Sequence, residues 1–223
     1  VTTGKYDPDN TMKYDQNDFE MICNEVTDSN CLAIRVDDDR YSDWDSFAAY
    51  WKQAGSLITS ASGLGITSDD ATADMLVAND LGVDVDIIAS GGSGDNVTFL
   101  LNGTTDFLMG NVSEMVAAHN DGQFKILCVF AEERDSNLPD VPTYEELTGN
   151  LVVGCSSRGY AMLKDVPDDI KQILGDAVKA AVQDPDLIEQ LNAIYTTTDY
   201  KEGQEYVDYM NQQQQQARET WGV

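Results

Sequence analysis

The strongest constraint on the fold is a repeated order of short apolar runs, glycine-bearing loops and helical patterns. Residues 57–60 form an apolar run that leads into the loop at residues 61–68, after which apolar residues recur at helical spacing. The same order returns at once, with an alternating run at residues 83–87, a loop at residues 90–95 and a short helical pattern. Strands that alternate with helices predict an α/β protein in which helices cover parallel strands.

Other apolar runs complete the predicted sheets. Residues 124–131 are the strongest of these, because they combine β-branched and aromatic residues with little charge. Shorter runs predict strands at residues 31–36 and 107–109, and a buried strand at residues 151–155. The sequence therefore predicts an α/β fold with mixed sheets.

Capping residues mark the predicted helix starts. Ser42 with Asp45, and Thr143 with Glu146, fit the capping box. Ser113 is placed to cap a helix that follows a short turn. These positions predict where three of the helices begin.

Two helical patterns stand out near the end of the chain. After Pro167, apolar residues recur at helical spacing up to Ala181, which predicts a long amphipathic helix. Helical spacing also continues through the glutamine-rich run at residues 212–216, so we expect a polar-faced helix there.

Acidic residues dominate the charge of this 223-residue chain. Asp and Glu number 40 against 13 Lys and Arg, for a formal net charge of -27. Nucleic acid is excluded as a partner, because phosphate binding needs clustered Lys and Arg and here the basic residues are scattered. An anionic membrane surface is disfavoured for the same reason. The acids indicate a solvated surface, and adaptation to high salt gives the same bias.

Four cysteines lack the close pairing of a zinc site or a redox motif: Cys23, Cys31, Cys128 and Cys155. We expect buried free thiols, while a disulfide between Cys23 and Cys31 stays open in an oxidising compartment. No apolar run is long enough for a transmembrane helix, and residues 1–9 are polar and acidic. The chain as given is therefore expected to be soluble, and any export signal lies outside it.

Groups for catalysis are scarce. His119 is the only histidine, and it lies late in a predicted helix where we expect it to face solvent. Acid pairs such as Asp69 and Asp70 fall at helix starts, where capping explains them, and no loop has the alternation of a calcium site. We therefore expect no catalytic residue, no metal and no cofactor.

Ligand-binding potential lies in three predicted strand-to-helix turns, at the strand ends where open α/β sheets bind ligands. Free N–H groups at helix starts hold an anion without Lys or Arg, so a carboxylate is the expected ligand group and phosphate the alternative. Tight turns without a ligand are the other interpretation. The candidate ligand-binding residues are Ser62, Gly63, Gly65, Thr67, Ser68, Gly91, Gly92, Ser93, Asp95 and Asn111.

Several motifs follow one another in an order typical of a known family. Gly91-Gly92, followed by LLNGTTD at residues 100–106, resembles that family's Gly-Gly turn and its LLGGxxD segment. LPDVPTYEE at residues 138–146, with Arg134 upstream, resembles its most specific stretch. From Ser60 to Val223 the chain resembles the solute receptors of tripartite tricarboxylate transporters, the TctC-like or Bug proteins.

The resemblance implies a periplasmic-binding-protein-like (type II) fold, with two lobes of mixed sheets around an interlobe cleft. It implies an extracytoplasmic, monomeric solute-binding protein without enzyme activity, which binds a small carboxylate-containing ligand and delivers it to membrane permease subunits. Lobe one is expected at residues 1–34 and 132–223, and lobe two at residues 35–131. Family members carry a further N-terminal strand, glycine-rich loop and helix, so lobe one is expected to be incomplete here. The location is then periplasmic, or membrane-anchored outside the cell through the absent N-terminal segment.

Two other functions stay open at this point. An α/β enzyme acting on a small carboxylated or phosphorylated metabolite would need a perturbed thiol or acid, for which Cys155 and Asp95 are the candidates. A ligand sensor that docks on a signalling partner would bind its ligand in the same way as a transport receptor. The sequence does not separate sensing from transport.

Overall fold

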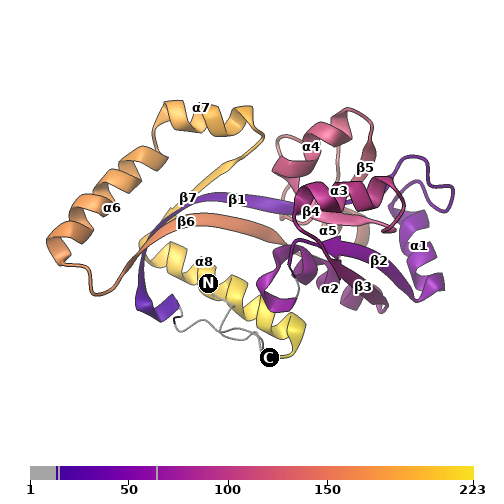
Figure 1. The fold of residues 1–223 in the computed structure, drawn as a ribbon, viewed down its shortest axis with the longest axis horizontal. Coiled ribbons are helices and arrows are strands. Elements are labelled where there is room, and N and C mark those ends of the chain that lie inside the picture. Colours follow the sequence, from indigo (N-terminus) through magenta and orange to yellow (C-terminus); the bar gives the residue numbers. More distant parts are fainter. Residues whose placement is uncertain (1–13, 15, 64) are drawn as a thin grey trace. The chain divides into compact units, whose positions relative to one another are not determined.

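A computed structural model of the chain describes residue 14 and residues 16–63 and 65–223 (Figure 1). Contacts divide the chain into two compact units. The first unit comprises the described residues up to Asp28 together with Ser157–Val223, and the second comprises Ser29–Ser156. Helices combine with parallel and antiparallel strands, which confirms the predicted α/β class with mixed sheets.

The unit boundaries differ from the predicted lobe boundaries at 34/35 and 131/132. In the structure they follow Asp28 and Ser156. Residues 132–156 belong to the second unit because Tyr144 packs there, with its ring centroid 5.3 Å from that of Phe130 and 5.1 Å from that of Trp44. The correspondence of these units to two receptor lobes around a cleft stays a prediction.

The strand β1 (Phe19–Arg35) contributes residues to both units. In the second unit its end pairs antiparallel with β4 (Leu108–Asn111) and with β5 (Phe124–Val129). In the first unit its beginning pairs antiparallel with β7 (Thr198–Glu202), and β6 (Cys155–Leu163) also pairs with β1. One strand is thus the shared element of the two sheet regions.

The second unit also contains a parallel pair of strands. β2 and β3 run in register from Ser56 opposite Asp84 to Ala61 opposite Ala89. A loop and a helix follow each of them, which confirms the repeated order predicted from the sequence. Besides β1 and the strands that pair with it, the elements of this unit are α1 (Trp44–Ala54), β2 (Ser56–Ala61), η3 (Gly65–Thr67), α2 (Asp69–Leu81), β3 (Asp84–Ala89), α3 (Ser93–Leu101), α4 (Val112–Asn120) and α5 (Tyr144–Thr148).

Apolar side chains of the second unit form two buried clusters, and the larger one is rich in aromatic rings. Phe47 is fully buried there, with its ring centroid 5.6 Å from that of Trp51 and 5.5 Å from that of Phe107. The indole N–H of Trp51 donates to the carbonyl oxygen of Asp84 at 2.8 Å, so this polar group is satisfied inside the cluster. The cluster draws residues from β1, α1, β2, α2, β4, β5 and α5, and therefore holds the ends of these elements in place.

The first unit has a smaller apolar core, formed around Ile22, Cys23 and Val182. Its long amphipathic helix and its glutamine-rich C-terminal helix confirm the two predictions for this part of the chain. Across the described part of the chain, no helix has the length and apolarity needed to cross a membrane. The elements of this unit, besides β1, β6 and β7, are η2 (Gln16–Asp18), α6 (Asp168–Val182), α7 (Pro185–Ala193) and α8 (Gly203–Trp221).

Two strand predictions need correction. The buried strand predicted at residues 151–155 is wrong, because residues 151–154 lie outside any strand and Leu151 is half exposed; β6 only begins at Cys155. The strand predicted at residues 31–36 is the end of the much longer β1. Polar residues earlier in β1 hid it, since buried Asn24, Asp28 and Asn30 break the apolar pattern.

Two helix starts also differ from prediction. Asp43, rather than Ser42, caps α1, and Ser46 is its capping-box partner. Asn111, rather than Ser113, is the N-cap residue of α4. The capping box of Thr143 and Glu146 is confirmed at the start of α5.

The cysteines are free, as predicted. Cys23, Cys31 and Cys128 are buried, and Cys155 is half-buried. The alternative disulfide between Cys23 and Cys31 is excluded, because both lie on β1 and an extended strand holds residues this far apart in sequence well beyond bonding distance.

Phe47→Ala should destabilise the second unit strongly. Loss of a fully buried ring leaves a cavity among Trp51, Phe107 and Tyr41, and such changes cost about 3–5 kcal/mol. Urea unfolding followed by tryptophan fluorescence measures this, since Trp44 and Trp51 lie in the same cluster. The control Val36→Ala, at a 60% exposed position, should change stability by less than about 0.5 kcal/mol. A loss below about 1 kcal/mol in Phe47→Ala would contradict the packing described.

Candidate functional site

The parallel pairing of β2 and β3 brings two of the predicted ligand loops together. Ala61 and Ala89 end the two strands opposite each other, and the backbone N–H of Ser90 donates to the carbonyl oxygen of Ala61 at 3.0 Å. The loops that follow therefore begin side by side at the carboxyl ends of parallel strands. This is the edge at which α/β sheets bind ligands.

In the loop after β2, the predicted residues take different roles. Ser62 is exposed, and Gly65 adopts a φ of 71° that favours glycine. The Ser68 hydroxyl accepts the backbone N–H of Ala71 at 3.2 Å and so caps α2. Gly63 follows Ser62, and a Cβ added to it would make only an ordinary van der Waals contact with Ser68. Thr67 is exposed.

In the loop after β3, the side chain of Asp95 bonds to the backbone of the same loop. Asp95 accepts the backbone N–H of Gly91 at 3.0 Å, and a Cβ on Gly91 would lie only 2.7 Å from that carboxylate oxygen. Gly92 is the N-cap residue of α3 with a φ of 148°. The first-turn N–H groups of α3, those of Ser93 and Gly94, have no partner within the helix and point out of its start. Asp95 shapes this turn, while Ser93 and Gly94 supply donors.

A hydrogen-bonded chain links the loop after β2 to the end of β4. The side-chain amide of Asn111 donates to Asp69 at 3.4 Å, and that of Asn30 donates to Asp69 at 3.4 Å and to Asp70 at 3.2 Å. The hydroxyl of Ser62 donates to the other carboxylate oxygen of Asp70 at 3.4 Å. Two predicted site residues, Ser62 and Asn111, are thus joined through residues that sequence reasoning did not include in the site.

One of the missed residues left a signal in the sequence. Asp74 occurs in the helical pattern between Ala71 and Ala78, where an apolar residue would be expected, and it is fully buried in the structure. Asp69 and Asp70 were assigned only to helix capping, and Asn30 preceded the predicted strand. Asn30 lies close to Asp69 and Asp70 because α2 packs against β1, and a local sequence pattern does not predict this packing.

Burial and like charge dominate the electrostatics of this cluster. Burial, then the neighbouring carboxylates of Asp69 and Glu114, raise the pKa of Asp70 to about 7, although hydrogen bonds from Ser62 oppose the shift. Burial, followed by the charge of Asp70, raises the pKa of Asp74 well above its ordinary value. Asp74 therefore favours the protonated form at neutral pH, whereas Asp70 is divided between its protonated and ionised forms near pH 7.

The starts of α2, α3 and α4 provide the opposite polarity. Each helix directs its first-turn N–H groups and the positive end of its dipole toward the loop before it. These backbone donors suit a small anion. In the part of the chain that the structure describes, no Lys or Arg forms an ion pair with Asp69, Asp70 or Asp74.

Comparison with known proteins identifies the family of this chain. The model of the tripartite tricarboxylate transporter family receptor matches residues 3–220. The chain belongs to this family. The resemblance carried by the LPDVPT stretch and the Gly-Gly turn is therefore confirmed.

Solved structures of this receptor family share the fold. A TctC solute-binding protein from Polaromonas is 25% identical, with 94% of this chain and 71% of that chain covered and a TM-score of 0.76. MatC from Rhodopseudomonas palustris, solved with bound malate, is 21% identical, with 98% and 74% covered and a TM-score of 0.80. These likenesses confirm the predicted periplasmic-binding-protein type of fold.

A curated relative from Agrobacterium vitis, the UPF0065 protein in the TAR-I ttuE-ttuC' intergenic region, is similar to part of the chain. It is 28% identical over 154 residues, which is 68% of this chain and 43% of that relative. The match therefore spans less than half of the relative's length.

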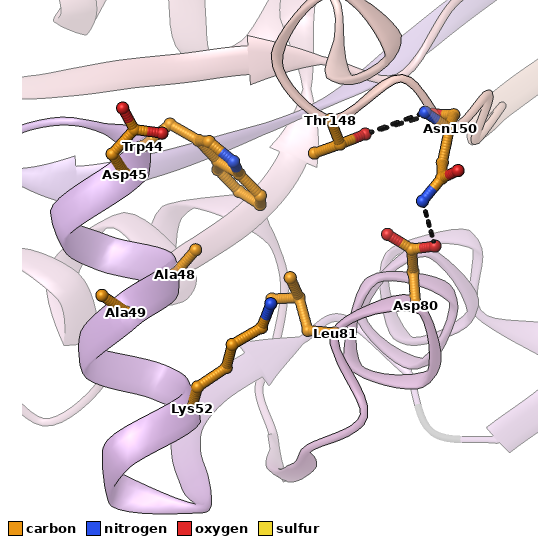
Figure 2. Close-up of a pocket in the computed structure, with 9 residues that line it drawn as sticks. All are labelled: Trp44, Asp45, Ala48, Ala49, Lys52, Asp80, Leu81, Thr148 and Asn150. Atoms are coloured by element: carbon orange, nitrogen blue, oxygen red, sulfur yellow. Dashed lines mark hydrogen bonds between the residues drawn. The ribbon is translucent and has the colours of Figure 1, made fainter.

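A pocket of about 410 Å³ lies elsewhere in the second unit of this receptor-family chain (Figure 2). Side chains of α1, the end of α2 and the segment after α5 line it, and none of the predicted ligand-binding residues does. Asp80 in this pocket accepts hydrogen bonds from the Tyr144 hydroxyl at 2.6 Å and from the Asn150 amide at 2.9 Å. Asp80 and Asp70 lie near opposite ends of α2, about 15 Å apart along the helix axis, so the pocket is separate from the predicted ligand loops.

Groups that could serve catalysis or bind metal take structural roles. His119 is half-buried, and its Nδ1 accepts the backbone N–H of Ile126 at 3.2 Å, which corrects the expectation that it faces solvent. Among residues 14, 16–63 and 65–223, no three His, Cys, Asp or Glu side chains are grouped so as to hold a metal ion.

Asp70→Asn should remove a pH dependence of stability. The folded state binds the Asp70 proton up to about pH 7, whereas the unfolded carboxyl ionises near its ordinary pKa of 3.8, so the free energy of unfolding falls as pH rises through this window. At 1.36 kcal/mol per pKa unit, the full effect is about 4 kcal/mol. Urea midpoints of wild type and Asp70→Asn, measured from pH 4 to pH 8, should diverge, with the variant the more stable at pH 8.

Asp121→Asn is the control for this comparison, because it removes an exposed acid at the C-terminal end of α4. Its midpoints should follow those of wild type across the range. Parallel curves for wild type and Asp70→Asn would show that Asp70 ionises normally in the folded state.

Proposed function

We propose that this chain is the ligand-binding part of an extracytoplasmic solute receptor, which binds a small carboxylate-containing molecule and delivers it to membrane permease subunits of a tripartite transporter. The observation that carries the proposal is the convergence of helix starts and small polar residues at the carboxyl ends of β2 and β3. Backbone donors of this kind bind a carboxylate without a paired cation.

In this proposal the site residues divide into donors and shaping residues. Ser62 supplies a hydroxyl, and Ser93 with its neighbour Gly94 supplies first-turn N–H groups of α3. Gly63, Gly65, Gly91 and Gly92 let the ligand approach the backbone, whereas Ser68 and Asp95 hold the two loops in shape.

The ligand class rests on chemistry and on relatives. Two R. palustris proteins of similar fold were solved with dicarboxylates, MatC with malate and Rpa4515 with adipate; the latter is 19% identical with a TM-score of 0.81. Family membership favours the same kind of ligand here. We propose a small carboxylate, and leave the number of its carboxyl groups to experiment.

We further propose that the protein performs no chemistry on its ligand. The two side chains with most potential for catalysis are engaged in the fold, His119 with the backbone of β5 and Asp95 with Gly91. The half-buried Cys155 stands at the start of β6. Binding without turnover distinguishes a receptor from the alternative enzyme.

The whole-receptor features are proposals of the same kind. We propose a monomer located outside the cytoplasm, with the two units as parts of two lobes, the first of them completed by an N-terminal strand and loop that this sequence does not contain. The Polaromonas and MatC structures exceed the matched region by roughly a quarter of their lengths, which supports such an addition.

A thermal-shift screen against malate, adipate, citrate, aromatic acids, amino acids and phosphate tests the ligand class. A ligand at 100 times its dissociation constant adds about 2.7 kcal/mol of stability, which raises the melting temperature by several degrees. We expect a shift with one carboxylate class and no consumption of that compound. Turnover of the ligand, or a shift with phosphate alone, would contradict the proposal.

Ser62→Phe should weaken binding of that carboxylate at least about tenfold, because the bulky ring covers the exposed loop and removes a hydroxyl donor. Isothermal titration calorimetry measures the change. Ser42→Phe, at an exposed position before α1, is the matched control and should bind as wild type does. Equal affinity in both variants would remove Ser62 from the site.

A further inference from the structure

Two carboxyl groups lie buried one helical turn apart at the start of α2. Asp70 is 6% exposed and Asp74 is 0% exposed. Neither carboxylate oxygen of Asp74 has a hydrogen-bond partner among the described residues. A buried carboxylate without a cation or donor is costly, whereas a carboxylic acid in the same place is tolerated.

Among the described residues, the charged groups that raise the pKa of these two carboxyls are all acidic. Asp69 on α2 and Glu114 on α4 act on Asp70, and Asp70 itself acts on Asp74. The other neighbours are uncharged, namely Asn30 on β1 and Ser62 after β2. If Asp70 were ionised, the charged side chains named here would all repel an anion bound beside Ser62.

Asn30 is an uncharged residue that lies against these acids. It is fully buried, its amide nitrogen donates to both Asp69 and Asp70, and its amide oxygen has no partner in the described structure. Its backbone N–H donates to the carbonyl oxygen of Gly154 at 2.8 Å, and a Cβ at Gly154 would lie 2.9 Å from its side-chain oxygen. The side chain is thus held beside Asp69 and Asp70, to which it donates, while its oxygen faces Gly154.

We propose that Asp70 is a further ligand-binding residue that carries a proton when the carboxylate ligand is bound, so that binding takes up a proton and weakens as pH rises. The inference rests on the proposed function of the Ser62 site. The proton comes from solvent and lies on the carboxyl oxygen that faces Ser62, where the neutral acid donates a hydrogen bond toward the ligand. Asp74 holds its own proton in both states and acts as a positioning residue behind Asp70.

Linkage gives the size of the effect. A bound anion raises the pKa of Asp70 further above its value of about 7 in the free protein, and by reciprocity protonation strengthens binding. Between pH 6.5 and pH 8.5 the dissociation constant of a dicarboxylate should rise about tenfold or more, although the ligand itself stays ionised throughout.

The first experiment needs no ligand. Wild-type protein with ¹³C-labelled aspartate is titrated by NMR, and Asp70→Asn and Asp74→Asn assign the two resonances. We expect Asp74 to stay protonated at neutral pH and Asp70 to titrate near pH 7. Two resonances that titrate near the ordinary aspartate value of about 3.9 would overturn the inference, whatever the protein binds.

The second experiment measures proton uptake directly. Calorimetric titrations of wild type with malate and with adipate, in two buffers of different ionisation enthalpy at pH 7.5, should show a fraction of a proton taken up per ligand bound. Asp70→Asn should bind at least about tenfold more tightly than wild type at pH 8.5, with less than about twofold dependence on pH. Asp121→Asn, the control, should reproduce the wild-type slope.

The outcomes separate this inference from the function on which it rests. Binding with no proton uptake, and with the same pH slope in wild type and Asp70→Asn, overturns the inference and leaves the receptor function standing. If neither malate nor adipate binds at any pH, while the screen finds no other carboxylate, both fail together. Binding that strengthens as pH falls in wild type and not in Asp70→Asn supports both.

Discussion

The antiparallel pairing of β1 on both of its edges is the constraint on which the second unit depends. Because β4 and β5 occupy the two edges, successive side chains of β1 must point into opposite layers. Leu32 and Ile34 enter the aromatic cluster, whereas Cys31 and Ala33 enter the other cluster. Alternation along one strand therefore divides the apolar core in two. It also places Asn30, two residues before Leu32, against the start of α2.

The proposed anion site combines two opposing electrostatic features. Helix starts and small polar residues offer hydrogen-bond donors to a negative group, while Asp69, Asp70, Asp74 and Glu114 surround the same place with acid. The conflict is relieved if the buried acids are neutral, since a protonated carboxyl donates rather than repels. The acids on the surface act differently, because solvent screens them within about 8 Å at physiological salt. The net charge of -27 therefore says little about the chemistry of the site itself.

The fold of this chain is similar to that of solved structures with low sequence identity. Structures only 21% to 25% identical overlay most of the chain, because strand order and core pattern persist while side chains change. The binding loops are less constrained by the core, so ligand preference can differ among proteins of the same fold. The pocket between α1 and α2 is a different feature, because none of the residues that line it belongs to the loops at the strand ends.

Local sequence was enough to predict the repeated strand, loop and helix order, the capping box of Thr143 and Glu146, and the family resemblance. These features depend on local periodicity, turn chemistry or motif order, which neighbouring residues record. The folded chain was needed to show that residues 19–30 are strand, that residues 151–154 are not, that Asp43 and Asn111 begin their helices, and that the cysteines form no disulfide. It also brought Asn30, Asp70 and Asn111 into one hydrogen-bonded group. Such contacts join residues distant in sequence, and the burial that shifts the pKa of an acid exists only after the chain has packed around it.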